Sequence, residues 1–129
     1  MDPRTAKAEA SAMIGHIVLF NPRPTATKEQ LRSFAQSISR TCASIPAVHR
    51  ATVGKRLHID AGYTRNFGDK TYDYLAIMEF EDTRGLLEYL RHPLHEKLGR
   101  LFWEMCESTV IVEVELADGK SRDLVEFLA

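Results

Sequence analysis

The amino-acid sequence predicts an α+β fold, in which one four-stranded antiparallel sheet carries its helices on a single face. Two observations support this prediction. Four apolar or alternating segments read as strands, and stretches with helical spacing separate them in the order β-α-β-β-α-β. The chain of 129 residues is long enough for one domain and too short for two ordinary ones. With right-handed crossovers, this order gives the ferredoxin-like arrangement.

The four predicted strands are recognised by apolar runs or by alternation between apolar and polar residues. The first run is rich in β-branched residues, and it ends where Pro22 and Pro24 bar a central strand from continuing. The predicted strands are 14–20, 48–59, 72–81 and 109–116. A loop over 60–71, rich in glycine, asparagine and aspartate, separates the second strand from the third.

The helices are predicted from caps and breaks. Thr27 and Gln30 have the spacing of a capping box, and the apolar residues that follow predict a helix over 28–44. A second helical stretch begins after Asp82-Thr83 and stops at a His-Pro step. Pro93 suits the first turn of a further helix, which we expect to end near Cys106. His92 and Pro93 are therefore predicted to form a structural helix junction.

The two ends of the chain are predicted to lie outside this domain. Residues 1–12 have no apolar face and read as a flexible N-terminal arm, whereas 13–116 form the domain. Residues 117–129 form a C-terminal extension, with a turn at Asp118-Gly119 and a short helix that Ser121 would cap.

The first strand is apolar on both faces, which indicates a partner. His16, Val18 and Phe20 alternate with Ile17 and Leu19, yet the helices can cover only one face of the sheet. The other face would be a large exposed apolar patch. We therefore predict a homodimer formed through the sheet face; the alternative is a monomer with scattered exposed valines and isoleucines.

Composition excludes several classes of function. The net charge of −1 gives no basic surplus for nucleic acid, and no apolar run is long enough to span a membrane. The first residues lack the apolar core of a secretory signal, and the two cysteines have no metal-site spacing. A cytoplasmic protein with reduced thiols is expected. No phosphate-binding glycine motif is present, so we predict neither a cofactor nor a metal.

Four stretches of the sequence resemble one known family. HIVLF (16–20), the Ile45-Pro46 step, IMEFED (77–82) and EYLRHPLH (88–95) are similar to the stress-responsive A/B barrel, or Dabb, family over residues 14–116. The resemblance implies a dimeric ferredoxin-like α+β barrel. Many members of that family have no assigned chemistry, and some are linked to stress.

One enzymatic branch of that family, similar to plant olivetolic acid cyclase, closes a linear poly-β-ketone by an aldol step. The resemblance implies His95 as general base, assisted by Tyr89. It also implies His16 as a cavity residue and Trp103 as a pocket wall. Tyr74 stands where the cyclase has another pocket histidine, so the resemblance leaves the polarity of the pocket and the substrate open. Phe34, on the first predicted helix, is a further expected pocket residue.

Each of these residues also has a structural interpretation. His95 would sit in the first turn of its helix, where the dipole disfavours positive charge and leaves a neutral base beside the Tyr89 donor. It could instead cap or pack at the helix junction. His16 is either a core histidine with a satisfied hydrogen bond or a group that lines a cavity. A metal site formed by His92 and His95 is a weaker possibility, because the helix break separates them.

Three functions remain open from the sequence. The first is a Dabb-type homodimer with an undefined or stress-related role, which binds a small apolar or enolisable molecule in a His/Tyr pocket. The second is a cofactor-independent cyclase or lyase that uses aldol chemistry. The third is a cofactor-free monooxygenase of the related dimeric barrel group. An open cavity in which His95, Tyr89 and His16 surround one ligand would favour the second function. A closed interface between the sheet and the helices would favour the first.

Overall fold

A computed structural model describes residues 13–60, 62 and 71–129. The elements follow one another as β1 (Met13–Pro22), α2 (Lys28–Ser44), β2 (Arg50–Lys55), β3 (Tyr74–Phe80), α3 (Thr83–Arg91), α4 (Pro93–Met105), β4 (Cys106–Leu116) and α5 (Leu124–Leu128). The strands form one antiparallel sheet in the order β2-β3-β1-β4. The predicted α+β fold is confirmed. The expected arm over 1–12 and most of the predicted loop over 60–71 lie outside the described residues.

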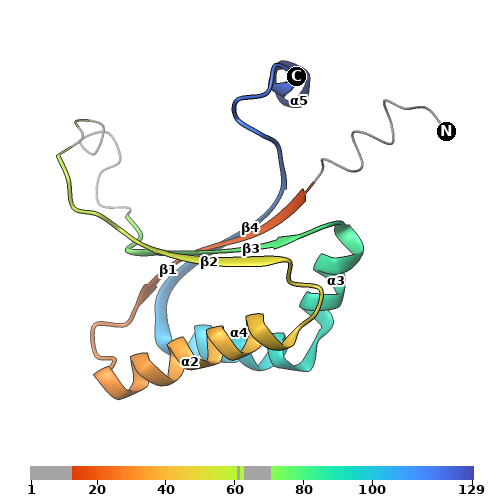
Figure 1. Ribbon diagram of the computed structural model, residues 1–129. Coiled ribbons are helices and arrows are strands. Elements are labelled where there is room, and N and C mark those ends of the chain that lie inside the picture. Colours follow the sequence, from red (N-terminus) through yellow and green to blue (C-terminus); the bar gives the residue numbers. More distant parts are fainter. Residues whose placement is uncertain (1–12, 61, 63–70) are drawn as a thin grey trace.

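The sheet and the helices form two layers. Figure 1 shows α2, α3 and α4 on one face of the sheet, while the opposite face carries none of these helices. The chain leaves β4 on that opposite side and ends in α5, which stands away from the helical layer (Figure 1). In the part of the chain that the structure describes, no helix combines the length and the apolar character that crossing a membrane requires.

Helix α2 forms where the sequence predicts it. The Thr27 hydroxyl accepts a hydrogen bond from the Gln30 N–H at 3.1 Å, and the Gln30 side chain accepts one from the Thr27 N–H at 2.9 Å. These two bonds satisfy donors that a helix start otherwise leaves open. The helix buries Phe34 against the sheet and ends before Pro46, which disfavours helical geometry at Ile45.

A single histidine joins α3 to α4. His92 is the C-cap of α3 and the N-cap of α4, with φ −69° and ψ 137°, and its Nδ1 accepts the Leu94 N–H at 3.1 Å. Pro93 occupies the first turn of α4, where its missing N–H costs no hydrogen bond. The chain turns sharply here, so the first turn of α4 faces back toward the end of α3. As a result, the ring of His95 in α4 lies close to that of Tyr89 in α3.

The strand boundaries differ from the predictions, most of all in β2 and β4. Strand β2 is shorter than 48–59, because it pairs only with β3, over Arg50 to Lys55, and because the Val48 N–H bonds to the Ile45 carbonyl in a turn. Strand β4 begins at Cys106 instead of at 109, since its pairing with β1 extends to Pro22 across a register shift.

The expected Ser121 cap is also wrong. Its hydroxyl accepts the Asp123 N–H at 3.1 Å within a turn. Helix α5 starts only at Leu124, with Asp123 at the N-cap position and no side-chain capping bond. Asp118 accepts hydrogen bonds from the Lys120 and Ser121 N–H groups and so holds these residues in a turn. The helix therefore cannot begin earlier.

The two faces of the sheet differ in what covers them. On the helical side, Val18, Phe20, Ala76, Met78 and Phe80 form the centre of the core. On the other side, Ile17 pairs with both Ile77 and Val112 in register. Ile17 and Ile77 are half-buried, and Val112 is 46% exposed. An apolar surface thus remains uncovered on the outer face, within the described chain.

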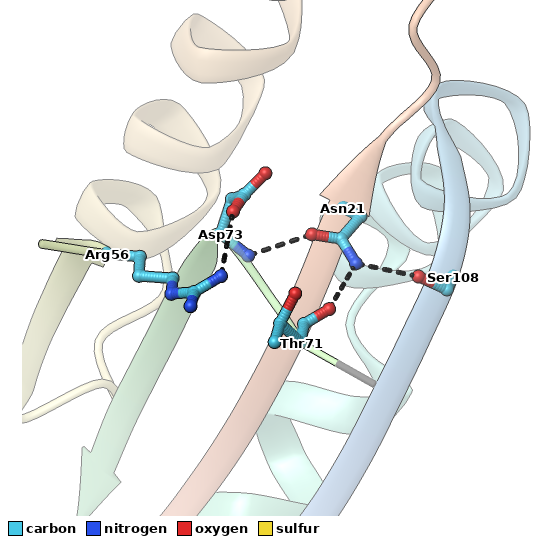
Figure 2. A network of polar contacts seen from close by, with 5 residues as sticks. All are labelled: Asn21, Arg56, Thr71, Asp73 and Ser108. Carbon is cyan, nitrogen blue, oxygen red and sulfur yellow. Dashed lines mark hydrogen bonds and ion pairs between the residues drawn. The ribbon is translucent and has the colours of Figure 1, made fainter. Parts of the chain in front are cut away.

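A polar network fixes one end of the sheet. Asn21 of β1 donates from Nδ2 to the Thr71 carbonyl at 2.8 Å and to the Ser108 hydroxyl at 3.0 Å, and its Oδ1 accepts the Asp73 N–H at 2.8 Å (Figure 2). Arg56 reaches Asp73 at 3.9 Å (Figure 2). The side chain of Asn21 therefore ties β1, the approach to β3 and the start of β4 together.

Candidate functional site

A cavity of about 260 Å³ lies between α4 and the sheet, near the start of β4. Most of its wall is apolar and includes Val18, Met78, Leu98, Phe102 and Ile111. Ser108, which the Asn21 network holds, borders it as well. A concave apolar space with a few convergent polar groups is the usual form of a small-molecule site.

Three polar side chains converge on this cavity from three elements. His16 comes from β1, Tyr89 from α3 and His95 from the first turn of α4. The ring centroids of Tyr89 and His95 are 4.6 Å apart. The ring centroid of His16 lies 5.5 Å from that of Tyr89 and 5.9 Å from that of His95. These groups can donate hydrogen bonds to one bound molecule or accept hydrogen bonds from it.

His95 is held in one tautomer. Its Nδ1 lies 3.1 Å from the Leu90 carbonyl oxygen, and a carbonyl can only accept, so Nδ1 carries the proton. Burial lowers the pKa of His95 below 6.5, and the nearby His16 lowers it further, although the Leu90 bond and Glu113 oppose this. Neutral His95 therefore keeps a lone pair on Nε2 near pH 7, and burial is the main cause of the lowered pKa.

Tyr89 is fully buried, and its hydroxyl has no hydrogen-bond partner among the described residues. Burial raises the pKa of Tyr89, and so do Cys42 and Glu113. The hydroxyl therefore keeps its proton and remains a donor. A buried polar group without a partner is costly, which makes this hydroxyl a strong indication of a ligand contact.

Tyr89→Phe is expected to leave the protein equally stable or more stable, by up to about 1 kcal/mol, because it removes an unsatisfied buried hydroxyl. Urea unfolding measures the change. Tyr74→Phe is the matched control, since the Tyr74 side chain is only half-buried and should alter stability by less than about 0.5 kcal/mol. A loss of more than about 1 kcal/mol in Tyr89→Phe alone would show that the hydroxyl is already bonded in the free protein.

His16 makes a short contact with an acidic side chain. Its Nδ1 lies 2.7 Å from Glu113 Oε2, and the two residues are directly opposed on β1 and β4. His16 is 3% exposed, whereas the Glu113 side chain is 42% exposed. His16 is therefore a core histidine with an acidic partner, and it also lines the cavity.

Of the other expected pocket residues, Tyr74 and Phe34 lie outside the cavity lining, whereas Trp103 belongs to it. Tyr74 stacks on Phe20 at 5.5 Å, and Phe34 packs edge-on against Phe102 at 4.7 Å. Both belong to an aromatic cluster below the cavity and are outside its lining. Trp103 does border the cavity, but it is 83% exposed, at the mouth.

Two residues at or beside the cavity, Cys106 in its lining and Glu113 against His16, have no clear signal in the sequence. Cys106 is buried in the lining, and burial raises the pKa of its thiol, although Thr109 and Arg23 oppose this. Glu113 could have been noticed as a charge within a valine-rich strand, but its pairing with His16 depends on strand register. In the described ranges, no group of three or more histidine, cysteine or acidic residues is placed to hold a metal ion.

Comparison with protein families gives a match over most of the chain. The family described as the Stress responsive A/B Barrel Domain, Dabb, matches residues 14–116. This range coincides with the one over which HIVLF and EYLRHPLH show their resemblance. No functionally curated protein matches the chain in sequence.

Solved structures share the fold. A dimeric ferredoxin-like protein of unknown function from Thermobifida fusca is 25% identical, with a TM-score of 0.65, over 82% of this chain and 92% of that one. A dimeric protein of unknown function with a ferredoxin-like fold from Bacteroides fragilis is 26% identical, with a TM-score of 0.59, over 81% and 96%. Hydroxynitrile lyase from Passiflora edulis is 14% identical, with a TM-score of 0.70, over 86% and 99%.

Proposed function

Because the chain belongs to the stress-responsive A/B barrel (Dabb) domain family, we propose that it is a homodimeric protein that binds a small, largely apolar carbonyl compound in its cavity. The unpartnered hydroxyl of Tyr89 carries this proposal. Tyr89 borders this apolar space, and a ligand carbonyl oxygen that reached its hydroxyl would satisfy it. The apolar wall would bury the body of the ligand.

The homodimer rests on the outer face of the sheet. Ile17, Ile77 and Val112 lie side by side there, on the face that does not carry α2, α3 or α4. Packing of two such faces would remove a contiguous apolar patch from water. The relatives from Thermobifida fusca and Bacteroides fragilis are described as dimeric, which supports the same assembly here.

Gly99→Phe is expected to weaken binding of acetophenone about tenfold or more, because the new ring would occupy the space of the ligand. Gly99 lies on the cavity wall, and a Cβ added there meets nothing within 4 Å, so the change should not strain the helix. Calorimetry measures affinity. Fluorescence reports occupancy, since Trp103 at the mouth is the only tryptophan.

Gly119→Phe is the matched control, because Gly119 is also in open space but lies in the turn after β4. It should bind acetophenone as the parent protein does. If Gly99→Phe binds acetophenone as tightly as the parent protein does, the cavity is not the site of ligand binding.

A second candidate function is a cofactor-independent lyase or cyclase. The distance of 4.6 Å between the ring centroids of Tyr89 and His95 favours it. His95 Nε2 would take a proton from the carbon next to a carbonyl, and the C–H electron pair would move into an enolate. The Tyr89 hydroxyl would donate to the enolate oxygen. The enolate carbon would then attack a second carbonyl of the same molecule, and the new alkoxide would take back the proton held on His95 Nε2. The fold shared with a hydroxynitrile lyase shows only that this architecture can hold lyase chemistry.

A further inference from the structure

The pair formed by His16 and Glu113 determines which hydrogen bonds the cavity can offer. An ionised carboxylate only accepts hydrogen bonds, so the proton in the 2.7 Å contact lies on His16 Nδ1. In neutral His16, the second ring nitrogen, Nε2, then carries a lone pair. His16 is almost fully buried and borders the cavity, so Nε2 is its remaining polar atom for a ligand.

His95 is held in the same way by a different acceptor. The Leu90 carbonyl engages Nδ1 of His95, and Glu113 engages Nδ1 of His16. Within the described chain, neither Nε2 atom makes a hydrogen bond. The site therefore presents two imidazole acceptors and one donor, the Tyr89 hydroxyl, around a single space.

We propose that Glu113 is a positioning residue that fixes the tautomer of His16, and that the cavity therefore selects neutral molecules with a hydroxyl group beside a carbonyl. This inference rests on the proposed binding function and names the ligand class. The carbonyl oxygen accepts from Tyr89, and the ligand hydroxyl donates to Nε2 of His16. A ligand without a donor leaves both lone pairs unmatched.

Carboxylate ligands are disfavoured by the same arrangement. A carboxylate would bring further lone pairs toward two acceptor nitrogens, and no lysine or arginine lines the cavity in the described ranges. Arg23 lies near the mouth, but its guanidinium donates to the main-chain carbonyls of Glu104 and Trp103. The acidic side chain of Glu107 lines the cavity and adds to the repulsion.

Three probes of similar size test the ligand class by calorimetry at pH 7.5: 2-hydroxyacetophenone, acetophenone and benzoate. We expect the hydroxyketone to bind about three- to tenfold more tightly than acetophenone, which is the effect of one added hydrogen bond, and benzoate to bind most weakly. Glu113→Gln should reduce the preference for the hydroxyketone to about twofold or less. Glu115→Gln, on the same strand and the same face, should keep it.

Nitrogen-15 NMR of the His16 ring separates positioning from general damage. The parent protein and Glu115→Gln should show His16 protonated at Nδ1 alone. In Glu113→Gln, the new amide can donate to Nδ1 as well as accept from it, so the Nε2–H tautomer should appear. A structural role alone would not change the tautomer.

Several results would overturn the inference: a doubly protonated His16 in the parent protein, tightest binding of benzoate, or an unchanged tautomer and preference in Glu113→Gln. If acetophenone binds but the hydroxyketone gains nothing, the inference fails and the proposed binding function stands. If none of the three probes binds, both fail.

Discussion

Ile17→Glu is expected to dissociate the homodimer into folded monomers, with a dissociation constant raised about a hundred- to several thousandfold. Ile17 lies on the central strand β1, between Ile77 and Val112 on the outer face of the sheet. A carboxylate at the centre of a buried apolar interface would have no partner, and an uncompensated buried charge costs roughly 3–5 kcal/mol. In the monomer the same side chain reaches water, so folding should be preserved.

Sedimentation velocity across a range of concentrations measures this dissociation, and circular dichroism checks the fold. Leu87→Glu is the matched control, because Leu87 is 39% exposed on α3, in the helical layer. This variant should remain dimeric. A parent protein that is monomeric at micromolar concentration, or an Ile17→Glu variant that dimerises normally, would rule out assembly through the sheet face.

His95→Ala is expected to slow deuterium exchange at the methyl group of bound acetophenone about 100- to 10,000-fold, if the enzymatic candidate is correct. This exchange is the proton abstraction step by itself, and NMR in deuterated buffer follows it without knowledge of the natural substrate. Because burial lowers the pKa of His95, the rate should be constant at and above neutral pH and should fall as the pH drops through this lowered pKa and His95 gains a proton.

His49→Ala is the matched control for this experiment, since the His49 side chain is 54% exposed and lies near Glu81, away from the cavity. It should exchange at the parental rate. Tyr89→Phe should also slow exchange, through loss of the donor to the enolate oxygen. If the parent protein does not accelerate exchange over buffer, or if His95→Ala is unaffected, the lyase candidate is rejected and ligand binding remains.

The local parts of this structure could be predicted because neighbouring residues cause them. The capping box of Thr27 and Gln30 starts α2, and the His92-Pro93 step both ends α3 and begins α4. Tyr89 and His95 meet across that step, only six positions apart, so a sequence motif is enough to bring them together. Alternation along β1 correctly separated the buried face from the outer one.

The remaining features depend on contacts between segments that are distant in sequence. His16 and Glu113 are 97 positions apart, and only the register of β1 against β4 brings them together. Packing also decided that Phe34 fills the aromatic cluster with Phe102 instead of the cavity. The sequence by itself determined the elements, the junction and the Tyr89–His95 pair, because short-range geometry is encoded locally. Only the tertiary structure decided which side chains line the cavity and that Glu113 pairs with His16, because strand register and side-chain packing arise from the whole chain.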